Sequence, residues 1–433
     1  MSTLIADYER RTPFSRALSE RARHAMPGGN TRTCAHFDPY PLALVRGSGP
    51  YVWDGDDNRY IDLNCNGMAI IHGQAFPPVV EALTRAAGQG TAWGGPSEQQ
   101  VELAEILCER IASAEEVRFV ASGTEAGMLA TKVARRATGR TLLVKAIWGY
   151  HGGFDDLEAG LHHNGELPGR VRLARYGDAA DFERVIAEEG ERVAAIVIEP
   201  ASVTGAVLPP PDFLPRLRAA ADRVGALLIL DECITYRTAL GGLQSRIGVD
   251  PDLTMLGKFI GGGLPLGVVA GKRAVLDHLD PTRPDHLYHS GSYNGSRLAT
   301  ATGVATLRHL TAEATEQMNA NAQTLERAVT EAATASGVPL TVSCVGSMVG
   351  FHFFTDEPKL DDGPLQARAR AEFHLAAVNA GVFLVPWDGV CCVSTAVDAA
   401  VIAEAGERLG AALATCADEL KRLGETQQEV VQR

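Results

Sequence analysis

The sequence predicts an α/β protein with a large, mostly parallel sheet and a smaller α+β domain built from both chain ends. Between residues 117 and 270, short apolar runs alternate with helical patterns. Strands almost free of polar residues are typical of parallel sheets whose two faces are covered by helices. The ends differ from this middle part, because a hairpin pattern stands near the N-terminus and long Ala-, Leu- and Arg-rich helices follow residue 310.

The length of 433 residues allows two domains, or one large domain with an appendage. We expect residues 76–312 to form the large domain. Residues 1–75 and 313–433 are expected to form the two parts of the small one.

The elements are expected in the following order. A hairpin over residues 50–62 has β-rich arms around an Asp/Gly/Asn turn. Candidate strands of the large sheet then cover 117–120, 141–145, 194–198, 226–230 and 265–270, with a helix over 124–137. Short strands near 348–354 separate a helix after Leu310 from a last helix over 399–423.

Charge and composition exclude several classes of function. The net charge of −13 argues against nucleic acid or an anionic membrane as a partner. The N-terminus lacks the apolar stretch of a signal peptide, and no run approaches the roughly 18 apolar residues of a membrane span. Eight cysteines without a C-x-x-C pair indicate reduced thiols and no metal site. We therefore expect a cytoplasmic protein that acts on small molecules.

Polar residues stand where several predicted strands end, namely Ser122, Glu199 and Asp231. In open α/β sheets the ligand lies beyond the carboxyl ends of the strands. Ser122-Gly123-Thr124 also opens the predicted helix, whose free N–H groups and positive dipole end suit a phosphate. The alternative for this motif is an ordinary helix cap followed by a capping glutamate.

Asp231 and Lys258, which follow further along the chain, both point to one cofactor. Lys258 lies between glycines, in Gly257-Lys-Phe-Ile-Gly-Gly-Gly, and such a lysine can hold an aldehyde as a Schiff base. Asp231 at a strand end can keep a pyridine ring protonated. Tyr150, before two glycines, has a ring that could stack on a flat cofactor. Taken singly, these residues have ordinary structural explanations. Together, in the order phosphate motif, aromatic ring, acid and lysine along the chain, they indicate pyridoxal phosphate. Only six residues of the chain are lysine, so few others compete with Lys258 for the role.

The pattern resembles the class III aminotransferases, which are fold type I pyridoxal phosphate enzymes, and within them the branch of glutamate-1-semialdehyde aminomutase and β-amino acid aminotransferase. The resemblance covers about residues 25–415, and the lysine segment is its most specific part. The matching stretches are Met26-Pro-Gly-Gly-Asn-Thr-Arg, Val52-Trp-Asp-Gly, Ser122-Gly-Thr-Glu-Ala, Tyr150-His-Gly, Ile198-Glu-Pro, Leu230-Asp-Glu, Leu256-Gly-Lys and His289-Ser-Gly-Ser-Tyr-Asn-Gly.

The resemblance implies a role for each matching residue. Lys258 would carry the cofactor and move the proton, Asp231 would contact the pyridine nitrogen, and Tyr150 would stack on the ring. The phosphate would be bound by Ser122 and by the backbone of Gly123 and Thr124, and Glu199 would support the network around the cofactor.

Two further roles concern the partner subunit and the substrate. Ser292 matches a threonine that reaches the phosphate of the neighbouring subunit, which implies a homodimer with shared active sites. Arg32 matches a position that binds the substrate carboxylate, a role suited to a guanidinium. The alternative for Arg32 is an exposed arginine in a Gly/Thr loop.

The chain also departs from the family pattern. Cys233 stands where a valine usually lies against the ring, and Ala121 replaces a common asparagine. Aminomutases carry a tryptophan in the segment that here reads Asn64-Cys-Asn-Gly-Met-Ala. Near the C-terminus, Trp387 and Asp388 stand in the region where aminomutases have a glutamate and β-amino acid aminotransferases an arginine. These departures indicate an intact cofactor site and a rebuilt substrate pocket.

The function predicted from the sequence is ping-pong transamination between a carboxylate-bearing amino compound and a carbonyl acceptor. Three alternatives stay open at this point. One is an intramolecular amino shift of the aminomutase type, and another is racemisation or decarboxylation on the same cofactor. The third is an inactive aminotransferase-like domain that serves as a sensor or scaffold, which the retained Lys258 and Asp231 disfavour.

Overall fold

A computed structural model describes residues 2–161, 165–358, 360, 363–386 and 389–431. Its contacts divide the chain into two compact units. The first unit contains residues 1–76, 203–207 and 316–433, and the second contains residues 77–202 and 208–315. The first unit thus contains both ends of the chain together with a five-residue segment from its middle.

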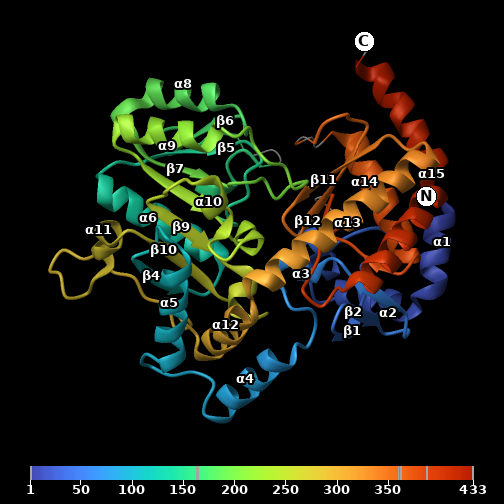
Figure 1. The fold of residues 1–433 in the computed structure, drawn as a ribbon, viewed down its shortest axis with the longest axis horizontal. Helices are drawn as coiled ribbons and strands as arrows, with labels where there is room; N and C mark the ends of the chain where they lie inside the picture. The colour runs from blue at the N-terminus through green and yellow to red at the C-terminus, as the bar shows by residue number, and fades with distance from the viewer. Residues whose placement is uncertain (1, 162–164, 359, 361–362, 387–388, 432–433) are drawn as a thin grey trace. The chain divides into compact units, whose positions relative to one another are not determined.

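The second unit is built on a seven-stranded sheet in the order β4-β10-β9-β8-β7-β5-β6 (Figure 1). Its strands are β4 (Glu116–Val120), β5 (Leu142–Ala146), β6 (Val171–Ala174), β7 (Val193–Ile198), β8 (Leu227–Asp231), β9 (Leu253–Leu256) and β10 (Gly267–Gly271). The pairs among β6, β5, β7, β8 and β9 are parallel, which confirms the mostly parallel sheet. The short runs β6 and β9 were not among the strands predicted from the sequence.

Strand β10 is the exception, because it pairs antiparallel with both β4 and β9. Only residues 257–266 connect β9 to β10. A parallel crossover needs a dozen or more residues, whereas a short connection leads back along the neighbouring strand. The site of Lys258 is therefore a tight return loop and not a crossover.

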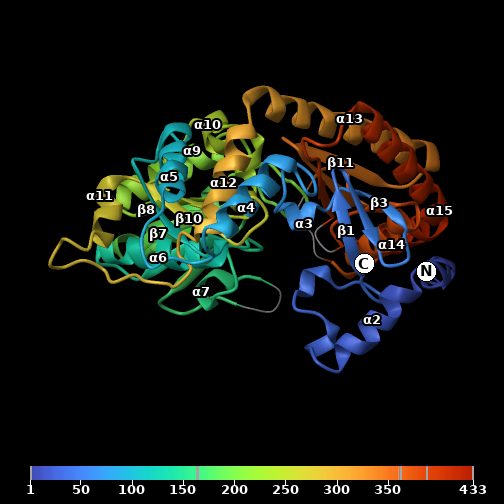
Figure 2. The same ribbon diagram turned by 90° about the horizontal axis from the view of Figure 1, so that it is seen from below.

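The two faces of this sheet are covered by different helices. Leu142, Val144 and Ile196 belong to a buried cluster with apolar residues of α8 (Ala179–Glu189) and α9 (Phe213–Val224). Leu143 and Val197 belong to a second cluster with α6 (Gly123–Thr138). In Figure 2 the strands β7, β8 and β10 lie between α9 and α6. Neighbouring residues of each strand thus face opposite clusters, and both faces are buried. For this reason the strands are continuously apolar in the sequence.

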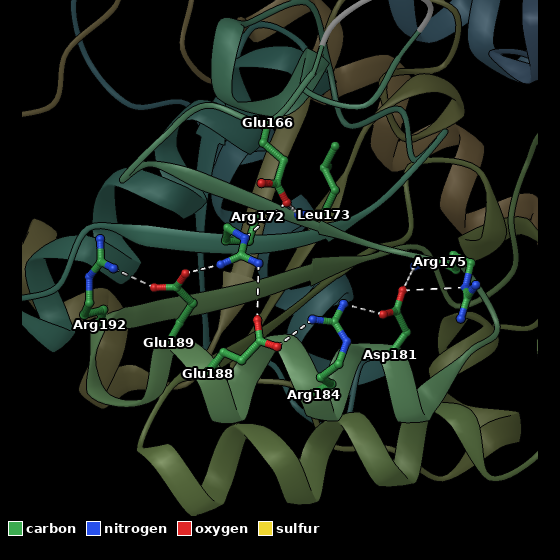
Figure 3. A network of polar contacts seen from close by, with 9 residues as sticks. All are labelled: Glu166, Arg172, Leu173, Arg175, Asp181, Arg184, Glu188, Glu189 and Arg192. Carbon is green, nitrogen blue, oxygen red and sulfur yellow. Dashed lines mark hydrogen bonds and ion pairs between the residues drawn. The ribbon is translucent and has the colours of Figure 1, made fainter.

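The remaining helices of the second unit pack around this core or connect its strands. They are α4 (Pro77–Gly88), α5 (Glu98–Arg110), α7 (Asp155–Glu158), α10 (Gly242–Ile247), α11 (Arg273–Leu276) and α12 (Arg297–His309). On the outer side of α8, Arg172 of β6 lies among Glu166, Glu188 and Glu189, in a chain of surface ion pairs (Figure 3). Such pairs contribute about 1 kcal/mol or less each, so the buried clusters dominate the stability of this unit.

The first unit contains two small sheets. One has the order β1-β2-β3-β13 and the other β11-β12-β14. Their strands are β1 (Leu44–Ser48), β2 (Tyr51–Asp54), β3 (Arg59–Asp62), β11 (Leu340–Val345), β12 (Met348–Phe353), β13 (Val382–Phe383) and β14 (Val390–Cys392). The antiparallel pair β2–β3 confirms the hairpin predicted from the sequence, and the parallel pair β3–β13 joins the two chain ends.

The helices of the first unit complete the fold. They are α1 (Ser2–Arg11), α2 (Pro13–Arg23), the short turn α3 (Cys65–Met68), α14 (Pro364–Asn379) and α15 (Ala399–Val431). Helix α13 (Ala312–Ser336) begins in the second unit and continues in the first. Of the helices in the described part of the chain, none is long and apolar enough to cross a membrane.

Candidate active site

The N-terminus of α6 lies directly after strand β4 and offers free backbone donors. Ser122 is the helix cap, and its hydroxyl accepts the N–H of Glu125 at 3.1 Å. The N–H groups of Gly123 and Thr124 have no hydrogen-bond partner among the described residues. All three residues from Ser122 to Thr124 are half-buried. This arrangement can bind a phosphate, since the helix dipole adds positive potential at the same point.

Asp231, the last residue of β8, is buried and paired. Its Oδ2 lies 2.9 Å from Nδ1 of His151, and its Oδ1 accepts the N–H of Cys233 at 3.0 Å. Burial by itself would raise the pKa of this carboxyl, but these hydrogen bonds outweigh it and hold the pKa below its usual value. Burial lowers the pKa of His151. The pair is therefore a carboxylate that accepts a hydrogen bond from a neutral imidazole.

Lys258 stands in the return loop after β9 in a left-handed backbone conformation, with φ of 57°. This conformation is strained for any residue other than glycine, and such strained residues cluster at functional sites. Lys258 is half-buried. A Cβ on its neighbour Gly257 would lie 3.3 Å from the Cα of Gly123, so the lysine loop passes close to the start of α6.

Cys233 links these parts of the site. A Cβ on Gly123 would lie 3.2 Å from its Sγ, and one on Gly257 would lie 3.3 Å from it. Burial raises the pKa of the Cys233 thiol well above its usual value; the charge of Asp231 raises it further and that of Lys258 lowers it. The thiol is therefore protonated and lies within the electrostatic reach of both residues.

Two buried residues at the carboxyl end of the sheet were missed by the sequence analysis. His151 directly follows Tyr150. Its hydrogen bond with Asp231 joins residues 80 positions apart and could not be predicted from a single sequence. Lys145 is fully buried in β5, and its amino group donates to the carbonyl of Ala159. Burial lowers the pKa of Lys145 to about 8, and Glu199 opposes this shift. A charged residue in an otherwise apolar predicted strand was the available signal.

The structure therefore brings most of the predicted residues together at one end of the large sheet. Ser122, Gly123, Asp231, Cys233 and Lys258 are joined by the contacts given above. Thr124 accepts a hydrogen bond from the N–H of Gly153, at 3.2 Å, in the loop that carries Tyr150 and His151. Glu199 follows β7 and is 3% exposed.

Three further predicted residues, Tyr150, Ser292 and Arg32, are exposed. Tyr150 is 52% exposed. Ser292 lines a shallow surface hollow together with Trp93, Tyr293 and Arg297. Arg32 belongs to the first unit and is exposed there. Trp387 and Asp388 lie outside the described residues.

The grouped residues fit a phosphorylated pyridine aldehyde. Two free helix amides match a phosphate, an ionised buried carboxylate matches a ring N–H, and a half-buried lysine matches an aldehyde. The Nε2 atom of His151 is buried without a hydrogen-bond partner among the described residues. No group of three or more His, Cys, Asp or Glu side chains within the described chain is placed to hold a metal ion.

Comparison with known proteins identifies the family. The family model of the class III aminotransferases matches residues 34–413 of this sequence. Glutamate-1-semialdehyde 2,1-aminomutase of Chloroflexus aurantiacus is 38% identical over 420 residues, which cover 89% of this chain and 92% of that protein.

Solved structures agree with this result. An omega-transaminase from Sphaerobacter thermophilus has a TM-score of 0.88 and 33% identity, covering 93% of this chain and 98% of that one. A β-phenylalanine aminotransferase from Variovorax paradoxus has a TM-score of 0.90 and 30% identity, covering 96% and 97%.

The chain belongs to the class III aminotransferases. It has the fold type I architecture, and it is an aminotransferase or aminomutase that depends on pyridoxal phosphate. The family and the cofactor predicted from the sequence are thereby confirmed.

Proposed function

We propose that this enzyme transfers an amino group from a carboxylate-bearing amino compound to a carbonyl acceptor in two half-reactions. The observation that carries the proposal is the buried pair of His151 and Asp231 at 2.9 Å, beside the free helix amides and the strained lysine. A fixed carboxylate at that point keeps a pyridine nitrogen protonated. When bound, pyridoxal phosphate supplies an electron-withdrawing ring that eases loss of a proton from the amine-bearing carbon.

Each residue of the site then has a task of its own. Lys258 would hold the cofactor through its Nζ, and the same amine would take up and return that proton. Ser122 and the amides of Gly123 and Thr124 bind the phosphate. The remaining proposed contacts with the cofactor are those of Tyr150, Cys233 and Glu199.

Substrate binding and assembly are also part of the proposal. Arg32 binds the carboxylate of the amino donor, because a guanidinium matches a carboxylate with two parallel hydrogen bonds. We propose that the enzyme works in the cytoplasm as a homodimer in which Ser292 reaches the phosphate bound by the neighbouring subunit. The solution mass of the holoenzyme tests the dimer, and the affinity of wild type and Ser292→Ala for pyridoxal phosphate tests this contact.

A second candidate is an intramolecular amino shift. The observation in its favour is the 38% identity to a glutamate-1-semialdehyde aminomutase. The same cofactor residues would serve both reactions, and they differ in whether the first carbonyl product leaves the enzyme.

The test is the visible absorbance of the purified holoenzyme during titration with α-, β- and γ-amino acids. Transamination predicts that one donor bleaches the lysine-bound band and that a keto acid restores it. An aminomutase would convert its substrate without net loss of the band and without an external acceptor. If the protein, saturated with pyridoxal phosphate, shows no such band, both candidates are wrong.

A further inference from the structure

The turn α3 in the first unit has an unusual backbone. Its four residues, Cys65, Asn66, Gly67 and Met68, have φ of 48°, 54°, 62° and 67°. Residues other than glycine visit this left-handed region as single residues and not in runs. The segment is therefore a left-handed turn, and such strain persists only where the surrounding structure over-determines it.

Hydrogen bonds at the end of β3 hold this turn. Oδ1 of Asp62 accepts the N–H of Cys65 at 2.8 Å, and Oδ1 of Asn64 accepts the N–H of Gly67 at 2.7 Å. The amide of Asn64 donates to the carbonyl of Leu384 at 2.9 Å. Cys65 and Met68 are buried, whereas Asn66 between them is exposed. The turn thus presents Asn66 from a rigid base.

The side chain of Asn66 contacts Arg32. Its Oδ1 accepts a hydrogen bond from Nη1 of Arg32 at 2.6 Å. Nη2 of Arg32 lies 3.7 Å from Sγ of Cys34, and a Cβ on Gly67 would lie 3.1 Å from Nη2. The guanidinium therefore rests against the turn at a point where glycine leaves room for it.

The charge of Arg32 is not neutralised by this contact. Asn66 is a neutral acceptor, and no carboxylate among the described residues pairs with Arg32. A guanidinium has five N–H donors and stays protonated at every relevant pH. Most of its donors and its full charge therefore remain for an anion.

We propose that Asn66 is a positioning residue for substrate recognition: its neutral amide orients Arg32 toward the carboxylate of the amino donor without reducing the charge that attracts it. This inference rests on the proposed role of Arg32. It predicts that the contact favours amino donors with a carboxylate and has no effect on simple amines.

Two substitutions separate positioning from mere support of the turn. Asn66→Gly tolerates the positive φ and removes the amide. Asn66→Asp keeps the size, the tolerance of this backbone and the hydrogen bond, but it places a negative charge on Arg32 and repels an incoming carboxylate. The variant that best preserves the structure is thus expected to harm carboxylate binding most.

The experiment measures KM and kcat of the holoenzyme with the amino acid that bleaches the wild-type band most efficiently, and with 1-phenylethylamine, which lacks a carboxylate. We expect Asn66→Gly to raise KM for the amino acid about tenfold and Asn66→Asp to raise it about 30-fold or more. For both variants kcat and the visible band are expected to change little. With the amine, KM is expected to stay within about twofold.

The outcomes distinguish this inference from the proposed function. If no amino acid reacts with the wild type, the proposed function is wrong and this inference falls with it. If Arg32→Ala leaves KM for the amino acid unchanged, the proposed role of Arg32 is wrong, and this inference falls while the transamination itself can stand. If Arg32→Ala raises KM while neither Asn66 variant does, only this inference is wrong. The inference is also overturned if Asn66→Gly and Asn66→Asp raise KM for the amino acid equally, or if they raise KM equally for the amino acid and the amine. If the wild type does not accept the amine, the comparison of KM between the two variants with the amino acid decides.

Discussion

Nδ1 of His151 and Oδ2 of Asp231 are 2.9 Å apart, and both side chains are buried. Asp231 is the last residue of β8 and His151 lies in the loop after β5, with β7 between these two strands. The neutral imidazole donates a hydrogen bond to a carboxylate whose pKa burial alone would raise. We therefore expect the proposed contact of Asp231 with a pyridinium to depend on His151, a residue that need not touch the cofactor.

Substitution of His151 tests this dependence. We expect His151→Phe to weaken cofactor binding about tenfold to 100-fold, because loss of a donor to a buried carboxylate costs about 1–3 kcal/mol. His151→Asn, which retains an amide donor, is expected to recover part of the affinity. Equilibrium binding of pyridoxal phosphate to the apoprotein measures both. Equal affinity of wild type and His151→Phe would show that the pair does not support the site.

Removal of Lys258 tests the covalent attachment. Lys258→Ala is expected to lose the visible band of the lysine-bound cofactor and the ability of borohydride to fix the cofactor to the chain, because no other described amine occupies this loop. Lys132→Ala serves as the control, since Lys132 is exposed on α6. A trappable yellow band in Lys258→Ala would disprove the assignment.

Substitution of Gly267, the first residue of β10, tests the proposed phosphate-binding end of the site. A Cβ there would lie 2.0 Å from the carbonyl oxygen of Ser122, so Gly267→Ala has to displace the cap of α6. We expect a loss of stability of about 1–3 kcal/mol and at least tenfold weaker cofactor binding. Urea unfolding of the apoprotein and cofactor titration separate the two effects. Gly88→Ala, where a Cβ meets nothing within 4 Å, is the matched control.

His374 in α14 predicts a pH dependence of folding. It is buried, with no hydrogen-bond partner for either ring nitrogen among the described residues, and burial lowers its pKa to about 3. The unfolded chain, with a histidine pKa of about 6.5, binds the proton more readily. Stability is therefore lost as the pH falls below about 6.5, by about 2 kcal/mol at pH 5.

The measurement is urea unfolding of wild type and His374→Leu at pH 7.5 and pH 5. The leucine variant is expected to lose about 2 kcal/mol less than wild type between these two values. His24→Ala, which alters an exposed histidine, should follow the wild type. A parallel pH dependence of wild type and His374→Leu would contradict the prediction.

Much of the fold was predictable because buried parallel strands are apolar at almost every position. The runs that became β5, β7 and β8 stand out for this reason. Strands β6 and β9 did not, since Val171–Ala174 includes an arginine and Leu253–Leu256 is only four residues long. The direction of β10 was also hidden, because an apolar run carries no information about which way its strand points.

The order of Ser122, Asp231 and Lys258 along the chain was enough to predict the cofactor and the place of its site, since the carboxyl ends of parallel strands meet at one edge of a sheet. Only the tertiary structure decided that His151 pairs with Asp231, that Lys258 adopts a positive φ, and that Asn66 accepts a hydrogen bond from Arg32. These features are contacts and backbone angles set by packing between segments distant in the sequence, whereas local patterns of residues record propensity and burial alone.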